Sequence, residues 1–255
     1  MSGISFDLFP GKIYAVIGPN GGGKSTLLKT LIGHLPVVSG RVLLDTDHGY
    51  GSVERARLIS VVMTMRPETE LMTVKEIVES GRLPFTGRFG SLSEADKSKV
   101  RDAMELTDTL ELADTEFLTL SDGQKTRAML ARAIAQDAAI LVLDEPTAYL
   151  DINYKLELIA LLKRLARERG TCVIMSVHEL ELVKHLADEI ICIKKGEPAK
   201  IGSYEEIFTE DYLRKLFDIK VSGGCEEAND KSNNGAGYHV RGRQKPHYSG
   251  PPESL

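Results

Sequence analysis

Tryptophan is absent from the 255 residues, and only three cysteines are present. Cys172, Cys192 and Cys225 are scattered without the close spacing of metal ligands, and the first two lie in apolar segments. This favours small buried thiols in a reducing compartment over a disulfide framework. No apolar segment approaches the roughly 20 residues that cross a bilayer. Asp7 and Pro10 interrupt the region where a signal peptide would need an apolar core, so we expect no secretory leader.

A surplus of basic residues is also lacking, since 37 acidic residues face 32 basic ones and the formal net charge is −5. A general nucleic-acid binder would instead be basic, so we expect no nucleic acid among the partners. Hydrophobic residues make up 42% of the chain, which is enough to build a proper core. The length suits one large domain or two small ones.

Apolar segments alternate with helical ones along most of the chain. We expect strands at residues 13–17, 41–44, 58–63, 139–143, 171–177 and 189–193. Helices are expected between them at residues 24–33, 73–81, 93–106, 123–136, 153–169 and 179–187. Residues 139–143 and 171–175 are apolar throughout, as in parallel strands that are covered on both faces. The pattern predicts an α/β fold with a mainly parallel sheet.

Two regions depart from this alternation. Residues from about 73 to 124 contain only helical patterns, and we interpret them as an α-helical subdomain inserted into the α/β core. From residue 222 the composition changes to Gly, Ser, Asn, Pro and charged residues, so residues 222–255 are expected to be a disordered tail. The predicted folded domain is therefore residues 1–221.

The most informative segment, residues 18–26, lies between an apolar run and a helical run. Glycines let a backbone wrap around phosphates, and a helix N-terminus points N–H groups at an anion. In such a phosphate-binding loop, Lys24 reaches the β- and γ-phosphates and Ser25 places its hydroxyl on Mg²⁺. A glycine-rich turn before an ordinary helix is the alternative. The candidate nucleotide-binding residues are Gly18, Pro19, Asn20, Gly21, Gly22, Gly23, Lys24, Ser25 and Thr26.

Three further polar residues follow predicted strands. Asp144 and Glu145 come after residues 139–143, at a strand end of the kind where open α/β sheets bind ligands. Asp144 is expected to hold Mg²⁺, and Glu145 to orient or deprotonate the water that attacks the γ-phosphate. His178 follows the strand at 171–177 and is expected to hydrogen-bond the γ-phosphate. The alternatives are an acidic pair that caps a turn and a surface histidine that caps a helix.

A second anion-binding turn is predicted at residues 120–124, directly before a helix. Ser121, Gly123 and Gln124 would supply a hydroxyl and backbone donors at the helix N-terminus. The pattern alone is weak, because Ser is a common helix N-cap. Its place between the phosphate loop and the acidic strand end makes it informative. The Leu-Asp of residues 150–151 is a candidate contact with a second subunit.

In this order the motifs resemble those of the nucleotide-binding subunit of an ATP-binding cassette (ABC) transporter, over roughly residues 4–220. The matches are residues 18–26 to the Walker A loop, 120–124 to the signature motif, 140–145 to Walker B, 148–151 to the D-loop and His178 to the switch histidine. The resemblance implies a P-loop ATPase that uses ATP and Mg²⁺, with Glu145, His178 and Lys24 as catalytic residues.

The resemblance also implies partners. Each ATP would lie between Lys24, Asp144 and Glu145 of one subunit and Ser121 and Gly123 of another, in a homodimer or with a paired ATPase subunit. Transmembrane permease subunits would be required, and a substrate-binding protein would take part indirectly. The chain would lie peripherally on the cytoplasmic face of the cell membrane.

A subfamily resemblance comes from the Gly-Arg-Leu-Pro-Phe-Thr-Gly of residues 81–87 and the Leu-Ser-Glu-Ala-Asp of residues 92–96. Both are similar to importers of iron-siderophores, haem and cobalamin. The alternative is an ordinary loop in which the aromatic ring packs within the subdomain. We expect a groove between residues 64 and 90 to receive a short helix from the permease. Its candidate apolar contacts are Leu71, Met72, Leu83 and Phe85.

The sequence departs from the family pattern in two places, one expected near the metal and the other near the adenine. No glutamine precedes Gln124, and Thr64 occupies the position of the Gln that contacts Mg²⁺ and couples to the membrane subunit. Thr64 is thus a third candidate metal ligand, with a shorter reach than Gln. The family also has a strand pair with an adenine-stacking aromatic before the Walker A strand. Because this sequence lacks that segment, we expect either a truncated gene model or a subunit with weak base recognition.

Three other functions stay open. A soluble ABC ATPase of translation or DNA repair would usually carry two cassettes or a long coiled-coil insertion. A nucleotide-binding subunit with impaired hydrolysis is compatible with Thr64. A P-loop kinase or GTPase would need an acceptor site or an Asn-Lys-x-Asp motif, and the latter does not occur.

Overall fold

The computed structural model describes residues 4–44, 51–63, 71–87, 90–148 and 150–219, which belong to a compact unit spanning Met1–Lys220. The predicted tail at 222–255 lies outside the described residues. Within them, no helix is both long and apolar enough to cross a membrane.

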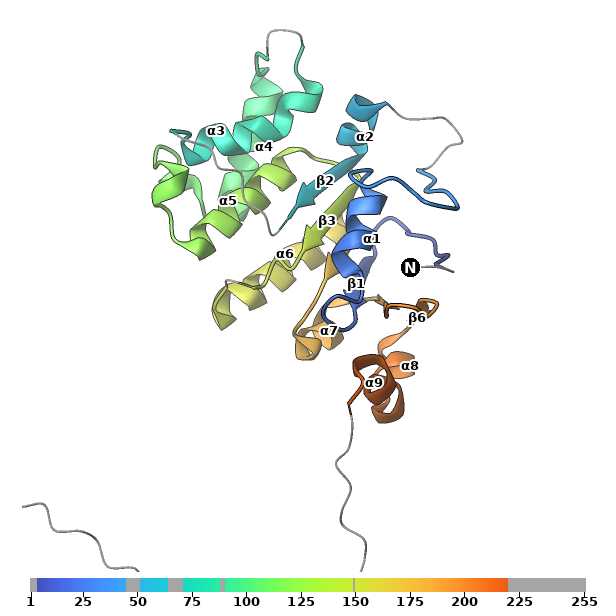
Figure 1. Cartoon of the computed structure of the whole chain (residues 1–255). Coiled ribbons are helices and arrows are strands. Elements are labelled where there is room, and N and C mark those ends of the chain that lie inside the picture. Colours follow the sequence, from blue (N-terminus) through green and yellow to red (C-terminus); the bar gives the residue numbers. More distant parts are fainter. Residues whose placement is uncertain (1–3, 45–50, 64–70, 88–89, 149, 220–255) are drawn as a thin grey trace, which may run out of the picture. The chain divides into compact units, whose positions relative to one another are not determined.

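A six-stranded sheet runs through the described part of the chain in the order β2-β3-β4-β1-β5-β6 (Figure 1). All neighbouring pairs are parallel except β5 and β6, which are antiparallel. The fold class predicted from the sequence, an α/β fold with a mainly parallel sheet, is confirmed. The strands are β1 (Ile13–Ile17), β2 (Ile59–Val62), β3 (Ile140–Asp144), β4 (Cys172–Ser176), β5 (Glu189–Cys192) and β6 (Lys200–Gly202).

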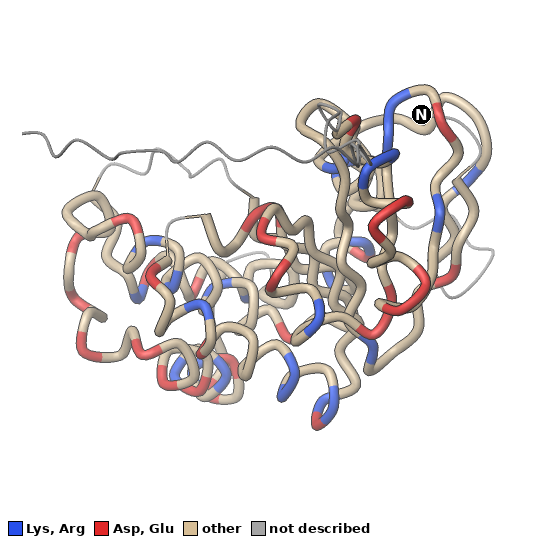
Figure 2. The backbone as a smooth tube through the Cα atoms, turned by 90° about the horizontal axis from the view of Figure 1, so that it is seen from below, with Lys and Arg blue, Asp and Glu red and all other residues tan. Residues whose placement is uncertain are grey.

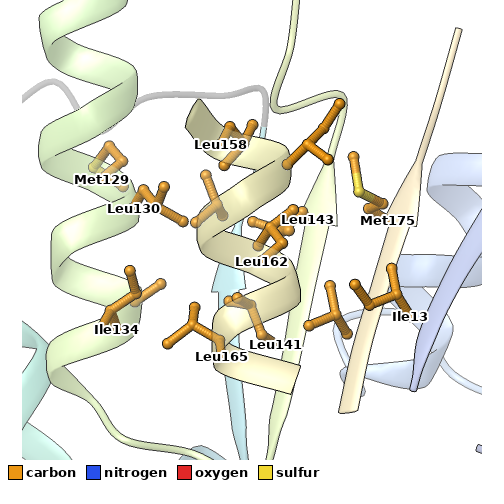
Figure 3. Close-up of a cluster of buried hydrophobic side chains, with 14 of the residues drawn as sticks. Ile13, Met129, Leu130, Ile134, Leu141, Leu143, Leu158, Leu162, Leu165 and Met175 are labelled. Atoms are coloured by element: carbon orange, nitrogen blue, oxygen red, sulfur yellow. The ribbon is translucent and has the colours of Figure 1, made fainter. Parts of the chain in front are cut away.

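Both faces of the inner strands β1, β3 and β4 are buried, which explains why these strands are almost entirely apolar. Side chains alternate across a strand, so Tyr14 and Val16 of β1 pack with α1 (Lys24–Leu31) on one face. Ile13 and Ile17 belong to the core on the other face. There the helices are α5 (Asp122–Ala135), α6 (Ile152–Arg169) and α7 (Leu180–Leu186). Figure 3 shows side chains of α5 and α6 meeting those of the strands in this second core.

The described residues between Val74 and Thr119 form only helical elements, apart from one isolated bridge that joins Thr73 and Glu116. Buried side chains of this segment, including Ile77 and Met104, join the core that contains α5. The boundaries of a separate subdomain at 73–124 stay a prediction. The elements are α3 (Val74–Glu79), η1 (Ser80–Phe85), α4 (Glu94–Leu106), η2 (Leu110–Leu112) and η3 (Phe117–Thr119).

A buried arginine connects this helical segment to α5. Arg82, 4% exposed, donates to Asp96 Oδ1 at 2.8 Å and to the carbonyls of Ala135 and Gln136 at 3.0 and 2.9 Å. Its guanidinium lies 4.1 Å from the ring centroid of Phe85. Hydrogen bonds from Ser93, followed by one from Arg82, lower the pKa of Asp96 to about 2. We call this cluster the Arg82 joint.

The prediction of a strand at residues 41–44 is wrong. Only Leu44 forms a single bridge, and residues 41–43 form no strand. A strand exists only where a neighbour supplies hydrogen-bonding partners. Here the segment borders an apolar cavity of about 1750 Å³ whose walls also include residues 4–10 and α1. No ladder partner is available there among the described residues.

Several short elements were not expected from the sequence. They are α2 (Ser52–Leu58), α8 (Tyr204–Ile207), α9 (Glu210–Phe217) and β6. β6 and α8 have only three and four residues, which is too short for a clear hydrophobic period.

Candidate functional site

The candidate site lies where three neighbouring strands end. β4 pairs with β1 on one side and with β3 on the other, and Ser176 of β4 is level with both Val16 and Asp144. The loop after β1, the acidic pair at the end of β3 and the histidine after β4 therefore meet at the carboxyl edge of the sheet. This is where open α/β sheets bind ligands.

The phosphate loop turns sharply between β1 and α1, and two glycines make this possible. Gly18 has a φ of 149°, and a Cβ there would lie 1.9 Å from the carbonyl oxygen of Ile193. Gly23, with a φ of 110°, is the N-cap of α1. Only glycine fits such backbone conformations without strain. The predicted order of strand, glycine-rich loop and helix is present.

Lys24 is buried inside this loop, with 5% of its surface exposed. Its Nζ donates to the carbonyl oxygens of Gly18 at 2.8 Å and Pro19 at 3.3 Å. Burial lowers the pKa of Lys24, and the nearby carboxylates of Glu145 and Asp144 oppose that shift. The loop thus holds a cation beside two acidic groups. The Lys24 ammonium can exchange its carbonyl partners for phosphate oxygens.

Ser25 and Asp144 form an oxygen pair next to Lys24. The Ser25 hydroxyl donates to Asp144 Oδ1 at 3.1 Å, and Asp144 is 5% exposed. A hydroxyl and a carboxylate are hard oxygen donors of the kind Mg²⁺ prefers. The described residues contain no group of three or more His, Cys, Asp or Glu side chains that would hold a metal alone. The pair therefore fits Mg²⁺ bound mainly through nucleotide phosphates and water.

Glu145 and His178 lie together at the solvent side of the site. Glu145 Oε1 and His178 Nε2 are 2.5 Å apart, and the two side chains are 30% and 39% exposed. Glu145 has a φ of 53°, in the left-handed region that residues with a Cβ seldom occupy. Strained residues of this kind occur often at functional sites. The pair can hold and orient a water molecule while remaining accessible to it.

Sequence reasoning overlooked Ser176. Its hydroxyl accepts a hydrogen bond from the Glu145 backbone N–H at 2.8 Å and donates to Asp144 Oδ1 at 2.7 Å. The available signal was a lone hydroxyl at the end of an apolar strand, two residues before His178.

The second predicted anion turn is intact but lies elsewhere. The Ser121 hydroxyl accepts from the Gln124 backbone N–H at 3.3 Å, and the Gln124 side chain accepts from the Ser121 N–H at 2.9 Å. With Gly123, they form the capped first turn of α5. In Figure 1, α5 and α1 lie on opposite sides of β3. Thr64 lies outside the described residues, so its predicted role as a ligand stays a prediction.

Lys24 supplies positive charge at the site from the start of the helix that follows the loop. Figure 2 shows Lys and Arg interspersed with Asp and Glu along the described chain. At the site, Lys24 and the N-terminus of α1 favour a polyphosphate. The structure brings Lys24, Ser25, Asp144, Glu145 and His178 together, while their chemical roles stay predictions.

Comparison with known sequences gives the family. The family model described as ABC transporter matches residues 1–148. An uncharacterised ABC transporter ATP-binding protein of Methanocaldococcus jannaschii is 36% identical over 89% of this chain and 79% of its own length. An iron(3+)-hydroxamate import ATP-binding protein of Bacillus subtilis is also 36% identical, over 82% of this chain and 78% of its own. A cobalamin import ATP-binding protein of Halobacterium salinarum has the same identity over 86% of this chain, which spans only 55% of that relative.

Solved structures agree with this assignment. A metal-chelate type ABC transporter in an inward-facing conformation has a TM-score of 0.75 and 30% identity, over 84% of this chain and 82% of its own. A dimeric ATP-binding cassette with bound ADP and Pi has a TM-score of 0.68 and 27% identity, over 78% of this chain and 88% of its own. Since the family model covers more than half of the chain and close relatives extend along most of it, the chain belongs to the ABC transporter family, whose ATP-binding subunits are ATPases that power transport.

Proposed function

We propose that this chain hydrolyses ATP to drive an importer of an iron-siderophore, haem or cobalamin. The observation that carries the ATPase role is the meeting of Lys24, Asp144, Glu145 and His178 at one edge of the sheet. The class of substrate rests on the residue pattern at 81–87 and on relatives named for iron(3+)-hydroxamate and cobalamin import.

Lys24 and the N–H groups before α1 would bind the β- and γ-phosphates, where positive charge stabilises the charge that spreads over the transferred group. Ser25 and Asp144 would hold Mg²⁺, which supplies further positive charge to the phosphates when bound. Glu145 would orient the attacking water and accept its proton. His178 contacts Glu145 and would donate a hydrogen bond to the γ-phosphate from the same side.

The capped turn of α5 supports a two-subunit site. Ser121, Gly123 and Gln124 form the first turn of α5, and α5 lies on the opposite side of β3 from α1, the helix that follows the phosphate loop (Figure 1). In a head-to-tail dimer, this turn would face the γ-phosphate bound by the other subunit. A dimeric cassette with ADP and Pi is among the similar structures.

Exposed apolar residues support docking to a permease. Leu71 is 83% exposed, Leu83 59% and Phe85 37%. Met72 is half-buried against the core. A short helix of a transmembrane subunit would cover these residues and hold the chain peripherally at the membrane. A substrate-binding protein would act on the permease rather than on this chain.

The direct test is ATP hydrolysis by the purified chain and by Glu145→Gln. We expect wild type to release phosphate and the variant to lose at least about 10³-fold in kcat while it still binds ATP. Glu168→Gln, at an exposed carboxylate near the end of α6, is the matched control and should remain active. Unchanged turnover in Glu145→Gln would contradict the role of Glu145 as base.

Two results would favour other functions. Tight nucleotide binding without hydrolysis by wild type would indicate a subunit with impaired hydrolysis. Copurification with ribosomes or DNA instead of membranes would indicate a non-transport ABC ATPase.

A further inference from the structure

We propose that Ser176 is a positioning residue of the ATPase site, whose buried hydroxyl fixes both the carboxylate of Asp144 and the backbone of Glu145. The proposal rests on the proposed function of that site. It adds Ser176 to Asp144, Glu145 and His178, as a residue that acts through its hydrogen bonds to the first two.

The location of Ser176 is the first argument. It ends β4, a strand whose other residues are Cys-Val-Ile-Met, and it is 0% exposed. It lies level with Asp144 of β3 on one side and Val16 of β1 on the other. A hydroxyl buried this completely must have hydrogen-bond partners, and the partners it has are the two residues of the acidic pair.

The second argument is the direction of the two bonds. The Glu145 N–H donates to Ser176 Oγ at 2.8 Å, and the Ser176 hydroxyl donates to Asp144 Oδ1 at 2.7 Å. A serine hydroxyl has one proton to donate, and here it is given to the carboxylate. Because Asp144 Oδ1 also accepts from Ser25, the side chain is fixed from two directions. Asp144 is thereby kept in the orientation that places a carboxylate beside the Ser25 hydroxyl.

The third argument is the backbone of Glu145. Its φ of 53° is strained for a residue with a Cβ, so surrounding contacts must hold it. The bond from its N–H to Ser176 is such a contact. In this conformation the Glu145 side chain lies beside His178, whose Nε2 is 2.5 Å from Oε1. Loss of the Ser176 hydroxyl should release both the metal-binding carboxylate and the residue that handles water.

A buried serine in the same sheet provides a matched control. Ser60 of β2 is 2% exposed, and its hydroxyl donates to the carbonyl of Ile140 at 3.4 Å, at the opposite end of β3. Ser60→Ala and Ser176→Ala each remove one buried hydroxyl from a strand. If Ser176 were only structural, the two variants would differ in stability alone.

The experiment measures kcat, KM and binding of a non-hydrolysable ATP analogue with and without Mg²⁺, on the full chain. For Ser176→Ala we expect kcat to fall about tenfold or more, and the Mg²⁺ concentration for half-maximal binding to rise about tenfold, as when a hydrogen bond to a metal ligand is lost. Binding without Mg²⁺ should stay within about twofold, since Lys24 and the loop are untouched. Ser60→Ala should match wild type in all three.

Ser176→Thr keeps the hydroxyl and should restore the Mg²⁺ requirement toward that of wild type. Ser176→Cys replaces the hydroxyl with a thiol, a weak hydrogen-bond donor of similar size. It takes the place of Ser176→Thr if that variant does not fold. Values of kcat and Mg²⁺ dependence for Ser176→Ala within twofold of wild type would overturn the proposal. If wild type itself does not hydrolyse ATP, the proposed function fails, while the Mg²⁺-dependent binding still decides the role of Ser176.

Discussion

The carboxyl edge of the sheet and the first turn of α5 both present groups that favour an anion, but different interactions hold them in place. At the sheet edge, contacts between neighbouring strands position Lys24, Asp144 and His178, which lie far apart in the sequence. In α5, the bonds of Ser121 and Gln124 stay within one turn. The position of that turn depends on how α5 is fixed, and the Arg82 joint holds its other end. One chain therefore carries two candidate anion-binding sites that are held in place by different contacts.

The largest stability effect should come from removing the Arg82 joint. Arg82→Met leaves Asp96 and two buried carbonyls without their guanidinium, and such a loss destabilises by about 3 kcal/mol. Denaturant unfolding measures this value. Arg101→Met, which breaks an exposed pair with Glu105, should change stability by less than about 0.5 kcal/mol.

The affinity of Arg82→Met for ATP tests whether the sheet edge and α5 are held in place independently. Because the phosphate loop is held by strand ends rather than by α5, affinity for ATP should stay near the wild-type value. A loss of affinity parallel to the loss of stability would show that the sheet edge and α5 are not held in place independently.

A smaller, pH-dependent effect should come from Asp96→Asn. The pKa of Asp96 is about 2 in the folded chain, below its ordinary value of 3.8, so ionised Asp96 stabilises the fold above the ordinary pKa. That contribution is lost as the pH falls toward 2. With allowance for solvent screening, we expect the variant to lose about 1–2 kcal/mol between pH 5 and 7. Unfolding curves at several pH values should show the difference narrowing below about pH 4, and a constant difference would contradict the assignment.

Much of the candidate site could be predicted because its residues follow recognisable strands. Asp144 and His178 come directly after apolar runs, Lys24 follows one through the glycine-rich loop, and parallel strands bring such positions to one edge. Ser176 was overlooked because a single serine in an apolar strand carries no local pattern. The partners of Arg82 are backbone carbonyls 53 and 54 residues away, which no motif displays.

The incorrect strand at 41–44 shows a related limit of sequence patterns. An apolar run has the propensity of a strand, but pairing decides the outcome. Residues 41–43 have no ladder neighbour among the described residues, whereas residues 140–144 lie between two. The left-handed conformation of Glu145 was equally hidden, since glutamate does not favour it.

The division of the ATP site between two subunits is tested most directly by mixing two inactive variants. Lys24→Met removes the cation that is proposed to bind phosphate, and Ser121→Arg blocks the first turn of α5. A mixed dimer would contain one site with both defects and one site with none, so ATP hydrolysis should reappear on mixing. As a control, the double variant Lys24→Met/Ser121→Arg is mixed with wild type. Each site of such a mixed dimer carries one defect, so ATP hydrolysis should fall below the value expected if wild type were simply diluted. If the two single variants remain inactive when mixed, although each folds and forms dimers, the shared site is contradicted.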